Sequence, residues 1–318
     1  MILPLLVLFG LTMPDPPRDS PEARALGFLA HEVPQWQSKN KCFSCHNNGD
    51  AARALYSAMR DRCPIPAGAL EGTTGWLVRP GNWDHDRGAP GFSDKGLARI
   101  QFASALATAM DAGVVRDRGP LQQAAELVAA NQQKDGSWRI GAEGTIGSPA
   151  TYGACLATYQ ASSILKKADR YRYRTAIQGA ERFLRKAPVE NTLDAAAIIL
   201  ALKSADEEDA RKQQERSIEL IRKGEAAGGG WGPYPNSPPE PFDTAVVILA
   251  LSDRHDRPTQ AMLSRARAYL IKAQSSDGSW PETTRPAGAQ SYAQRISTTA
   301  WATMALHAGR ESERKWRP

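Results

Sequence analysis

The sequence predicts an all-α protein in which helical hairpins close into an α/α toroid. Two segments are nearly identical: Val128 to Trp138 reads VAANQQKDGSW, and Leu270 to Trp280 reads LIKAQSSDGSW. A third copy, Ile218 to Trp231, keeps the glycines and the tryptophan but loses the Gln and the Asp. Threonines that begin apolar segments recur at Thr151, Thr192, Thr244 and Thr298, at spacings of 41, 52 and 54 residues. Such spacings are typical of arrays of helical hairpins.

Each repeat predicts an outer helix, a tight turn and an inner helix. The outer helix, as in Arg265 to Ala273, has one charged face and is expected to be half exposed. The Asp-Gly pair supplies the turn, because Gly tolerates positive φ and Asp bonds to its own backbone. The second helix of each pair is apolar around nearly its whole circumference, which predicts burial inside a closed ring. These inner helices are expected at Thr151 to Leu165, Thr192 to Leu202, Phe242 to Leu251 and Ser297 to Leu306.

Length and composition predict one large domain and exclude several classes of protein. The chain has 318 residues, of which 42% are hydrophobic and 23% charged, and its mean hydropathy is −0.46. No apolar run approaches the roughly 18 residues that cross a bilayer, so a polytopic membrane protein is excluded. The net charge of +6 is spread among interleaved acids, so no nucleic-acid partner is expected. The toroid is expected over residues 18–310, with its clearest repeats at 121–307 and a charged tail at 311–318.

The N-terminus predicts export. Residues 1–13 read MILPLLVLFGLTM, and prolines and charges follow up to Ser20. Residues 1–17 are therefore expected to be a signal peptide or an N-terminal anchor, with a first buried helix as the alternative. The protein would then be periplasmic, extracellular or anchored, and could associate with a membrane surface.

The repeats resemble the QW motifs of the squalene-hopene and oxidosqualene cyclases. The segment from Ser297 to Leu306, STTAWATMAL, is similar to the last inner helix of the bacterial members. Residues Glu240 to Leu251, EPFDTAVVILAL, resemble the helix that carries the cyclase acid motif Asp-x-Asp-Asp. The resemblance covers about Leu121 to His307 and implies an α/α toroid of the terpenoid-cyclase and prenyltransferase type. Fold alone does not fix activity, because related toroids include prenyltransferase subunits and polysaccharide lyases.

The acid motif departs from the cyclase pattern. Its four positions are Glu240, Pro241, Phe242 and Asp243, and in the cyclases the third position donates the proton that starts cyclisation. Phe242 has no proton to donate, so we expect cyclase activity to be lost. Asp243 is expected to cap the inner helix. The alternative is a divergent terpenoid cyclase or lyase in which Glu240 or Asp243 is the acid.

The motif with the most specific chemistry is Cys42-Phe43-Ser44-Cys45-His46. The pattern C-x-x-C-H is the attachment signature of a c-type haem, with His46 as the proximal iron ligand. Candidate ligands for the opposite face of the iron are His31, Met59 and His85. Because the motif stands where other hairpins carry their tryptophan loop, a haem is expected in a loop at the rim of the toroid.

Two other interpretations of the cysteines remain open. Zinc could be bound by Cys42, Cys45, Cys63 and one histidine among His31, His46 and His85. Alternatively, the thiols hold no cofactor, either paired in a loop or unpaired. Cys155 is expected to be a small buried hydrophobe.

The sequence as a whole predicts an exported toroid with one covalent haem, used for electron transfer or redox-linked binding. Its partner would be a redox protein or an apolar small molecule. The alternatives are the divergent cyclase or lyase, and a non-enzymatic toroid that binds lipid or protein and holds a structural zinc. A set of aromatic residues is expected to pack in the core rather than to line a cavity: Trp76, Trp83, Phe92, Phe102 and Tyr152.

Overall fold

The computed structural model describes residues 19–85, 95–141, 145–285 and 291–316. The residues expected to form the export segment, 1–17, and Phe92 lie outside this description. The protein is 66% helix, and the described residues form no strand. None of the helices in these ranges is long and apolar enough to cross a bilayer.

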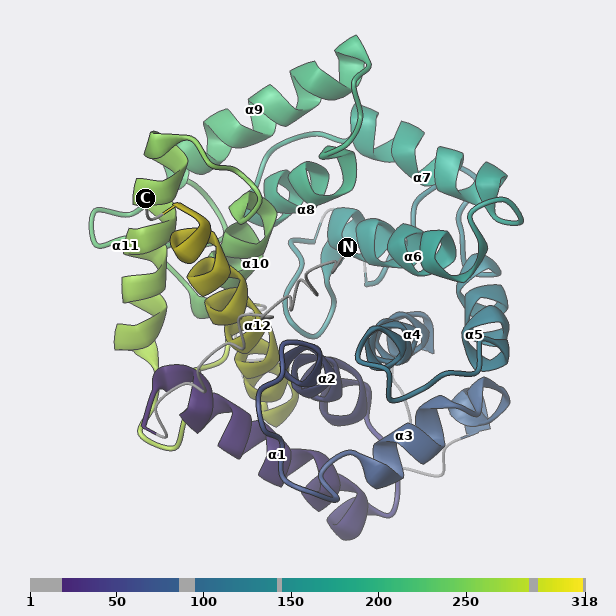
Figure 1. The fold of residues 1–318 in the computed structure, drawn as a ribbon. Coiled ribbons are helices and arrows are strands. Elements are labelled where there is room, and N and C mark those ends of the chain that lie inside the picture. Colours follow the sequence, from purple (N-terminus) through teal and green to yellow (C-terminus); the bar gives the residue numbers. More distant parts are fainter. Residues whose placement is uncertain (1–18, 86–94, 142–144, 286–290, 317–318) are drawn as a thin grey trace, which may run out of the picture.

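Outer and inner helices alternate along the chain and form two concentric rings (Figure 1). The outer helices are α1 (Pro21–Asn40), α3 (Glu71–Leu77), α5 (Gly119–Ala129), α7 (Arg174–Lys186), α9 (Glu208–Gly224) and α11 (Arg257–Ala273). The inner helices are α2 (Ala52–Arg60), α4 (Lys95–Asp111), α6 (Gly153–Asp169), α8 (Thr192–Leu202), α10 (Pro241–Leu251) and α12 (Tyr292–Trp316). A π-helix, η1 (Cys45–Ala51), leads into α2, and a 3₁₀-helix, η2 (Pro80–His85), follows α3. The ring is closed because α12 packs against both η1 and α2. The expected α/α toroid is confirmed.

The inner helices match the apolar segments that the sequence singled out. Helix α8 spans the predicted residues, and α10 begins one residue before the predicted start. Most residues of these two helices are buried and none is exposed, as expected of a helix that is apolar on all sides. Helix α12 is longer than expected and runs through most of the segment expected to be a charged tail.

The tryptophan of each repeat ties its inner helix to its outer helix in the same way. The indole Nε1 atoms of Trp138, Trp231 and Trp280 each donate a 2.7 Å hydrogen bond to the carbonyl ten residues earlier. Their backbone N–H groups donate to threonine hydroxyls on the inner helices, those of Thr158, Thr244 and Thr299. The threonines that bond to the tryptophan backbone in the first and last repeats are therefore not Thr151 and Thr298, which the regular spacing in the sequence had singled out. The loop between the tryptophan and its inner helix differs in length from repeat to repeat.

The glutamine of the repeat joins one hairpin to the next. The side-chain amide of Gln132 donates to the carbonyl of Ala176 at the start of α7, at 2.8 Å. That of Gln274 donates to the carbonyl of Pro21 at the start of α1, also at 2.8 Å. The last repeat is thus bonded to the first helix, and this contact closes the outer ring.

The expected aromatic core is confirmed for the described residues. Trp83, Phe102 and Tyr152 are at most 1% exposed, and Trp76 is also buried. They fill the space between helices, as aromatic side chains commonly do in large cores.

Candidate functional site

The Cys42–His46 segment connects α1 to the first inner element. Cys42, Phe43 and Ser44 precede η1, whereas Cys45 and His46 form its first turn. The sequence suggested a loop at the rim for the whole motif. In the structure only its first three residues precede η1, and His46 belongs to the inner ring. Ser44 caps the element, since its hydroxyl accepts a 3.1 Å hydrogen bond from the backbone N–H of Asn47.

Buried amides hold this turn in place. The side-chain amide of Asn47 donates to the carbonyl of Glu32 at 3.1 Å and to the hydroxyl of Tyr292 at 2.8 Å. The amide of Asn48 donates to the hydroxyl of Thr73 at 2.8 Å. Four elements are joined in this way, namely α1, η1, α3 and α12. Such satisfied buried networks fix one conformation.

His46 lies against two aromatic rings. Its ring centroid is 5.2 Å from that of Trp36 and 6.1 Å from that of Tyr292, with edge-on geometry in both cases. Trp36 and Tyr292 stack on each other at 5.5 Å. Burial lowers the pKa of His46 to about 4, so the imidazole is neutral at pH 7.

The two nitrogens of His46 have different surroundings. Nδ1 lies 3.8 Å from the sulfur of Cys45. Nε2 is buried and has no hydrogen-bond partner. A buried nitrogen without a partner is costly unless a ligand occupies it. The imidazole therefore has the free coordinating atom that the C-x-x-C-H motif predicts.

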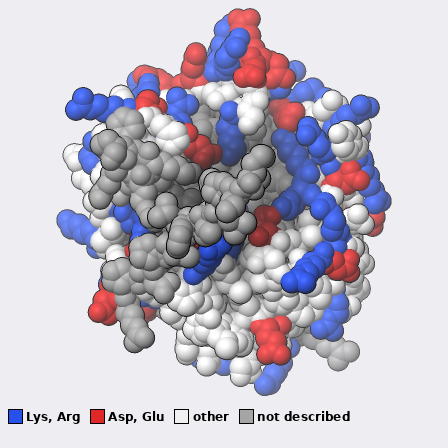
Figure 2. Space-filling view, in the orientation of Figure 1, with Lys and Arg blue, Asp and Glu red and all other residues white. Residues whose placement is uncertain are grey.

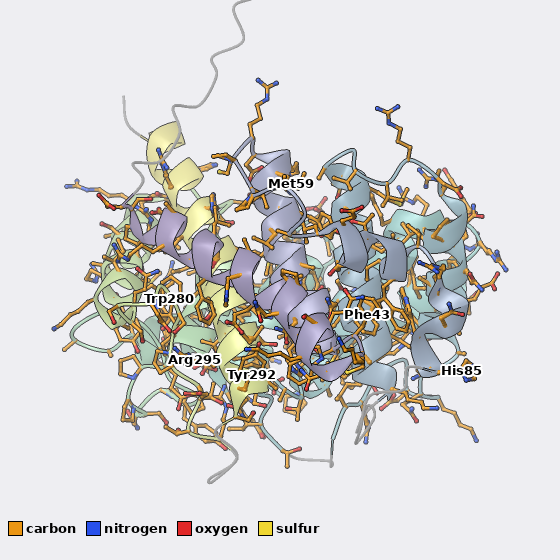
Figure 3. All side chains as sticks on the ribbon, turned by 90° about the horizontal axis from the view of Figure 1, so that it is seen from below. Phe43, Met59, His85, Trp280, Tyr292 and Arg295 are labelled. Carbon is orange, nitrogen blue, oxygen red and sulfur yellow. The ribbon has the colours of Figure 1, made fainter. Side chains whose placement is uncertain are left out.

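Within the described residues, none of the three candidates for the opposite iron ligand makes a hydrogen bond or ring contact with His46. The side chain of His31 is 64% exposed and its Nδ1 lies 3.1 Å from the carboxylate of Glu32. Met59 is 36% exposed at the far end of α2, and His85 is exposed at the end of η2. In the side view of Figure 3, Met59 lies near the upper face of the toroid and His85 toward its lower face.

The proposed zinc ligands do not assemble either. Across the parts of the chain that the structure describes, no three His, Cys, Asp or Glu side chains lie in an arrangement that could hold a metal ion. Cys42, Cys45, Cys63 and the three candidate histidines all fall within those parts. The structure gives the zinc interpretation no coordination site.

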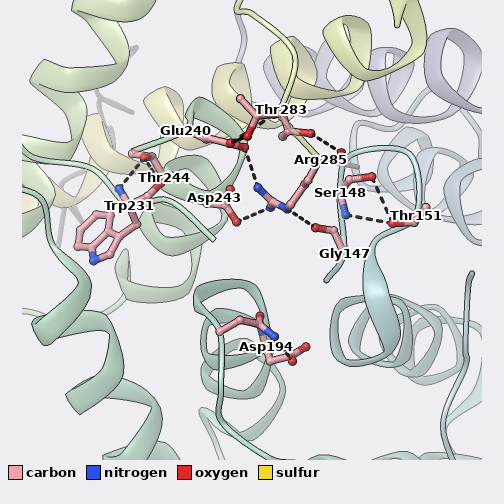
Figure 4. A network of polar contacts seen from close by, with 12 residues as sticks. Gly147, Ser148, Thr151, Asp194, Trp231, Glu240, Asp243, Thr244, Thr283 and Arg285 are labelled. Atoms are coloured by element: carbon pink, nitrogen blue, oxygen red, sulfur yellow. Dashed lines mark hydrogen bonds and ion pairs between the residues drawn. The ribbon is translucent and has the colours of Figure 1, made fainter. Parts of the chain in front are cut away.

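The acids at the cyclase-like motif are held by an arginine (Figure 4). Arg285 donates 2.7 Å hydrogen bonds to Glu240 Oε2 and to Asp243 Oδ1, and a 2.8 Å bond to the carbonyl of Gly147. Burial raises the pKa of Asp243 to about 6, although the positive charge of Arg285 acts in the opposite direction. Glu240 accepts in addition from the hydroxyl of Thr284. The structure brings the two predicted acids together, around a cation on the loop before α12.

Neither the third motif position nor Asp243 is open to a ligand in this conformation. Phe242 is fully buried, with its ring 5.9 Å from that of Trp301. Asp243 is likewise 0% exposed, and its second oxygen, Oδ2, has no partner. A proton donor has to reach its substrate, so this arrangement is that of a buried ion pair near a helix start.

A second buried acid was missed by the sequence interpretation. Asp50, four residues after His46, is 0% exposed and accepts hydrogen bonds from the hydroxyl of Tyr152 and, at 2.7 Å, from the amide of Gln101. Burial raises its pKa to about 6, and these hydrogen bonds together with nearby Arg53 limit the rise. Arg53 itself lies over the ring of Trp301, at 5.1 Å. No apolar pattern marks Asp50, because its element reads CHNNGDA; its place directly after the C-x-x-C-H motif was the available signal.

Comparison with known proteins places the fold. The family model described as the squalene-hopene cyclase C-terminal domain matches residues 186–316. The type II terpene cyclase MstE from Scytonema is 14% identical, with a TM-score of 0.59 over 92% of this chain and 99% of that one. The chain has the α/α toroid fold of type II terpene cyclases. No curated protein matches the sequence.

Two further solved structures share this toroid. MstE in complex with its product, merosterolic acid A, is 15% identical with a TM-score of 0.60, and the alignment covers 92% of this chain and 98% of that one. A protein from Actinoplanes is 16% identical with a TM-score of 0.58, and 91% and 99% of the two chains are covered. At these identities the likeness concerns the toroid alone, so chemistry has to be argued from the residues.

Proposed function

We propose that this toroid is an exported, non-cyclising protein that carries one covalent c-type haem on Cys42, Cys45 and His46. The haem would serve electron transfer or redox-linked binding, with a redox protein or an apolar small molecule as partner. One observation carries the proposal: His46 Nε2 is a buried nitrogen without a partner, in the first turn after two correctly spaced cysteines.

The donor set fits a c-type haem. The thiols of Cys42 and Cys45 would form the two thioether bonds, and His46 Nε2 would bind the iron. A haem bound there supplies one-electron chemistry at its iron. The neutral imidazole is suited to ligation because the pKa of His46 is lowered by burial.

The surrounding residues position the histidine rather than react. Ser44 and Asn47 fix the turn that presents the motif, and Trp36 and Tyr292 contact the imidazole ring. Because Met59 and His85 lie at the ends of their elements and His31 is exposed beside Glu32, we expect no protein ligand from this group on the opposite face of the iron. That expectation favours redox-linked binding of a small molecule over simple electron transfer.

The loss of cyclase activity is supported by the buried acids. Phe242 stands at the position of the proton donor, and Asp243 and Asp50 are both 0% exposed. Arg285 pairs with Asp243 and Glu240, so neither is an unpaired acid. We therefore do not favour the divergent cyclase or lyase, although an aspartate-to-alanine variant of MstE, which has the same fold, has been captured with its product, merosterolic acid A.

Export and haem attachment support each other. Haem is attached to C-x-x-C-H motifs outside the cytoplasm, and the apolar residues 1–13 have the length of an export signal. A chain that stayed in the cytoplasm would be neither exported nor given a covalent haem, so the two predictions stand or fall together.

The test is an absorption spectrum and a denatured mass of the chain produced in a host with c-type maturation machinery. We expect a Soret band and a mass gain of one haem that survives denaturation. Both should disappear in the Cys42→Ala/Cys45→Ala variant and persist in Cys155→Ala, which removes a buried cysteine outside the motif.

The spectrum also tests the role of His46. In His46→Ala, we expect the ligand-field bands of the iron to change while any thioether mass is retained. An unmodified mass without a Soret band in the parent chain would overturn the haem proposal. Stoichiometric zinc in that same sample would favour the structural-zinc alternative instead.

A further inference from the structure

A second site lies at the other end of the toroid, where the inner helices finish. There α6, α7 and the end of α8 enclose a groove of about 690 Å³. The half-buried Ala201 and Ala205 and the exposed Tyr171 contribute apolar surface to it, whereas Lys166, Arg170 and Arg174 contribute cations. Figure 2 shows Lys and Arg side chains gathered along the right-hand side of the molecule, over α5, α6 and α7. The site does not involve the Cys42–His46 segment.

The turn that borders the groove alternates arginine and tyrosine. Residues 170–174 read RYRYR, and the side chain of Tyr171 is 84% exposed. The guanidinium of Arg170 lies 5.9 Å from the ring centroid of Tyr171. Arginine and tyrosine are the residue types that most often dominate binding energy at protein interfaces.

Two of the cations in the groove have no acid of their own. Lys166 is paired with Glu181 at 2.9 Å, and Arg185 with Glu207 at 2.7 Å, so the acids at the groove are occupied. Within the described residues, neither Arg170 nor Arg174 has a salt-bridge partner. These two guanidiniums are therefore available for external carboxylates, which they can bind in a bidentate manner.

The turn is held in one conformation before any partner binds. The carboxylate of Asp169 accepts 2.9 Å hydrogen bonds from the backbone N–H groups of Tyr171 and Arg172. Arg172 is itself anchored to Glu126 on α5 at 2.7 Å. A turn that is already ordered costs less entropy on binding.

We propose that this groove binds an acidic peptide segment of a partner protein. Carboxylates of the segment pair with Arg170 and Arg174, and an apolar side chain enters the groove against Ala201 and Ala205. The shape of the site favours a peptide over a lipid bilayer, since a flat bilayer surface cannot fill a concave groove. The apolar walls favour it over a free inorganic anion, which would leave them unused.

The test uses fluorescein-labelled peptides and fluorescence anisotropy. We expect a repeat of Glu-Glu-Leu to bind, a repeat of Lys-Lys-Leu not to bind, and a repeat of Glu-Glu-Ser to bind more weakly. The Arg170→Glu/Arg174→Glu variant should lose at least about tenfold in affinity, because arginines are enriched among the residues that dominate binding and the reversed charges repel the peptide carboxylates. The matched variant Arg222→Glu/Lys272→Glu, which reverses two exposed charges on α9 and α11, should stay within about twofold.

A charge-neutral variant separates the groove from general electrostatic attraction. Ala205 borders the groove, so Ala205→Trp should fill it and weaken the Glu-Glu-Leu repeat to the level of the Glu-Glu-Ser repeat. Circular dichroism and thermal melting establish that each variant is folded.

Two results would overturn the proposal. One is equal loss of binding in the two double variants, which would mean that only net charge matters. The other is arginine-dependent binding of phosphatidylglycerol vesicles without binding of the acidic peptide, which would make the site a membrane contact. Neither result bears on the haem proposal, because Arg170 and Arg174 lie at the opposite end of the ring from His46.

Discussion

Two kinds of connection between an outer and an inner helix differ in how they satisfy their polar groups. In the repeats that end at Trp138, Trp231 and Trp280, a buried indole, a threonine hydroxyl and close-packed glycines join the two helices. Between α1 and η1, the Cys42–His46 segment takes the place of the tryptophan loop. Here the backbone N–H groups of Ser44 and Asn47 donate to the side chains of Asn48 and Ser44, and the Ser44 hydroxyl donates to the side chain of Asn47.

The two kinds of connection differ in what they leave unsatisfied. In the tryptophan loops the indole nitrogen and the backbone N–H of the tryptophan both have partners. In the Cys42–His46 connection, the buried His46 Nε2 has none, and neither has Nε1 of Trp36, the neighbouring ring on α1. The three regular tryptophan connections therefore satisfy their own polar groups, whereas the irregular Cys42–His46 connection leaves a coordinating nitrogen without a partner, which is what the haem proposal requires.

The largest expected effect tests this division through two tryptophans. Trp280→Ala should lower the free energy of unfolding by about 3–5 kcal/mol, because a fully buried indole and two hydrogen bonds are lost. Trp36→Ala removes a partly exposed ring whose nitrogen bonds to nothing, so its cost should be below about 2 kcal/mol. Urea denaturation followed by circular dichroism measures both.

The comparison would fail if Trp36→Ala cost as much as Trp280→Ala. Trp280→Phe supplies an intermediate case, because it keeps an aromatic ring but leaves the carbonyl of Leu270 without its donor. Its cost should fall between those of the two alanine variants.

The next effect concerns the acid that follows the irregular connection. Because the pKa of Asp50 is about 6 in the folded protein and 3.8 in a model compound, the folded state binds the proton more tightly. The contribution of Asp50 to the free energy of unfolding is therefore greatest below about pH 4, and it is lost as the pH rises from about 4 to about 6. Asp50→Asn cannot ionise, so it should gain up to about 3 kcal/mol relative to the parent between pH 4 and pH 7.

The amide can be accommodated at this site, since Gln101 Oε1 is buried without a partner and can accept from it. The matched variant is Asp206→Asn. The carboxylate of Asp206 is exposed, so this variant should show no pH-dependent gain in stability over the parent. A difference between Asp50→Asn and the parent that stays constant with pH would contradict the burial argument.

Much of the fold could be predicted because its signals are local. The apolar run of α8 and the Asp-Gly-Ser-Trp segments each lie within a few turns of chain. The register of the threonines could not be predicted, because the bonded threonine lies 20, 13 and 19 residues after Trp138, Trp231 and Trp280. Only packing decides which hydroxyl reaches the tryptophan backbone.

The candidate site was predicted less completely for a related reason. The Cys42–His46 motif and the loss of the acid at Phe242 are readable in the sequence. The pairing of Asp50 with Tyr152 spans 102 residues, and that of Asp243 with Arg285 spans 42. Such contacts are created by ring closure, and no local pattern indicates them.

A further prediction concerns ring closure in the regular part. Gly278 has φ of +91°, and a Cβ there would lie 2.4 Å from the carbonyl oxygen of Arg24 on α1. Gly278→Ala should therefore cost about 2 kcal/mol or more, because backbone has to move as well as adopt a strained conformation. Thermal melting and urea midpoints measure the loss.

Gly113 provides the matched control. It also has positive φ, at +72°, but nothing lies within 4 Å of an added Cβ. Gly113→Ala should cost only the conformational penalty of about 1 kcal/mol. Equal costs at the two positions would mean that contact between the last loop and α1 contributes nothing to closure.

The smallest expected effect separates two neighbouring threonines on α12. Thr299 accepts a 3.0 Å hydrogen bond from the backbone N–H of Trp280, whereas the hydroxyl of Thr298 is buried and has no partner. Thr299→Val should cost about 1–2 kcal/mol, since it leaves a buried donor unsatisfied. Thr298→Val removes an unsatisfied group of the same size and should be neutral or slightly stabilising. If Thr298→Val were the more harmful change, the repeat register would be wrong by one residue, and the bond that defines the regular connection would belong to Thr298.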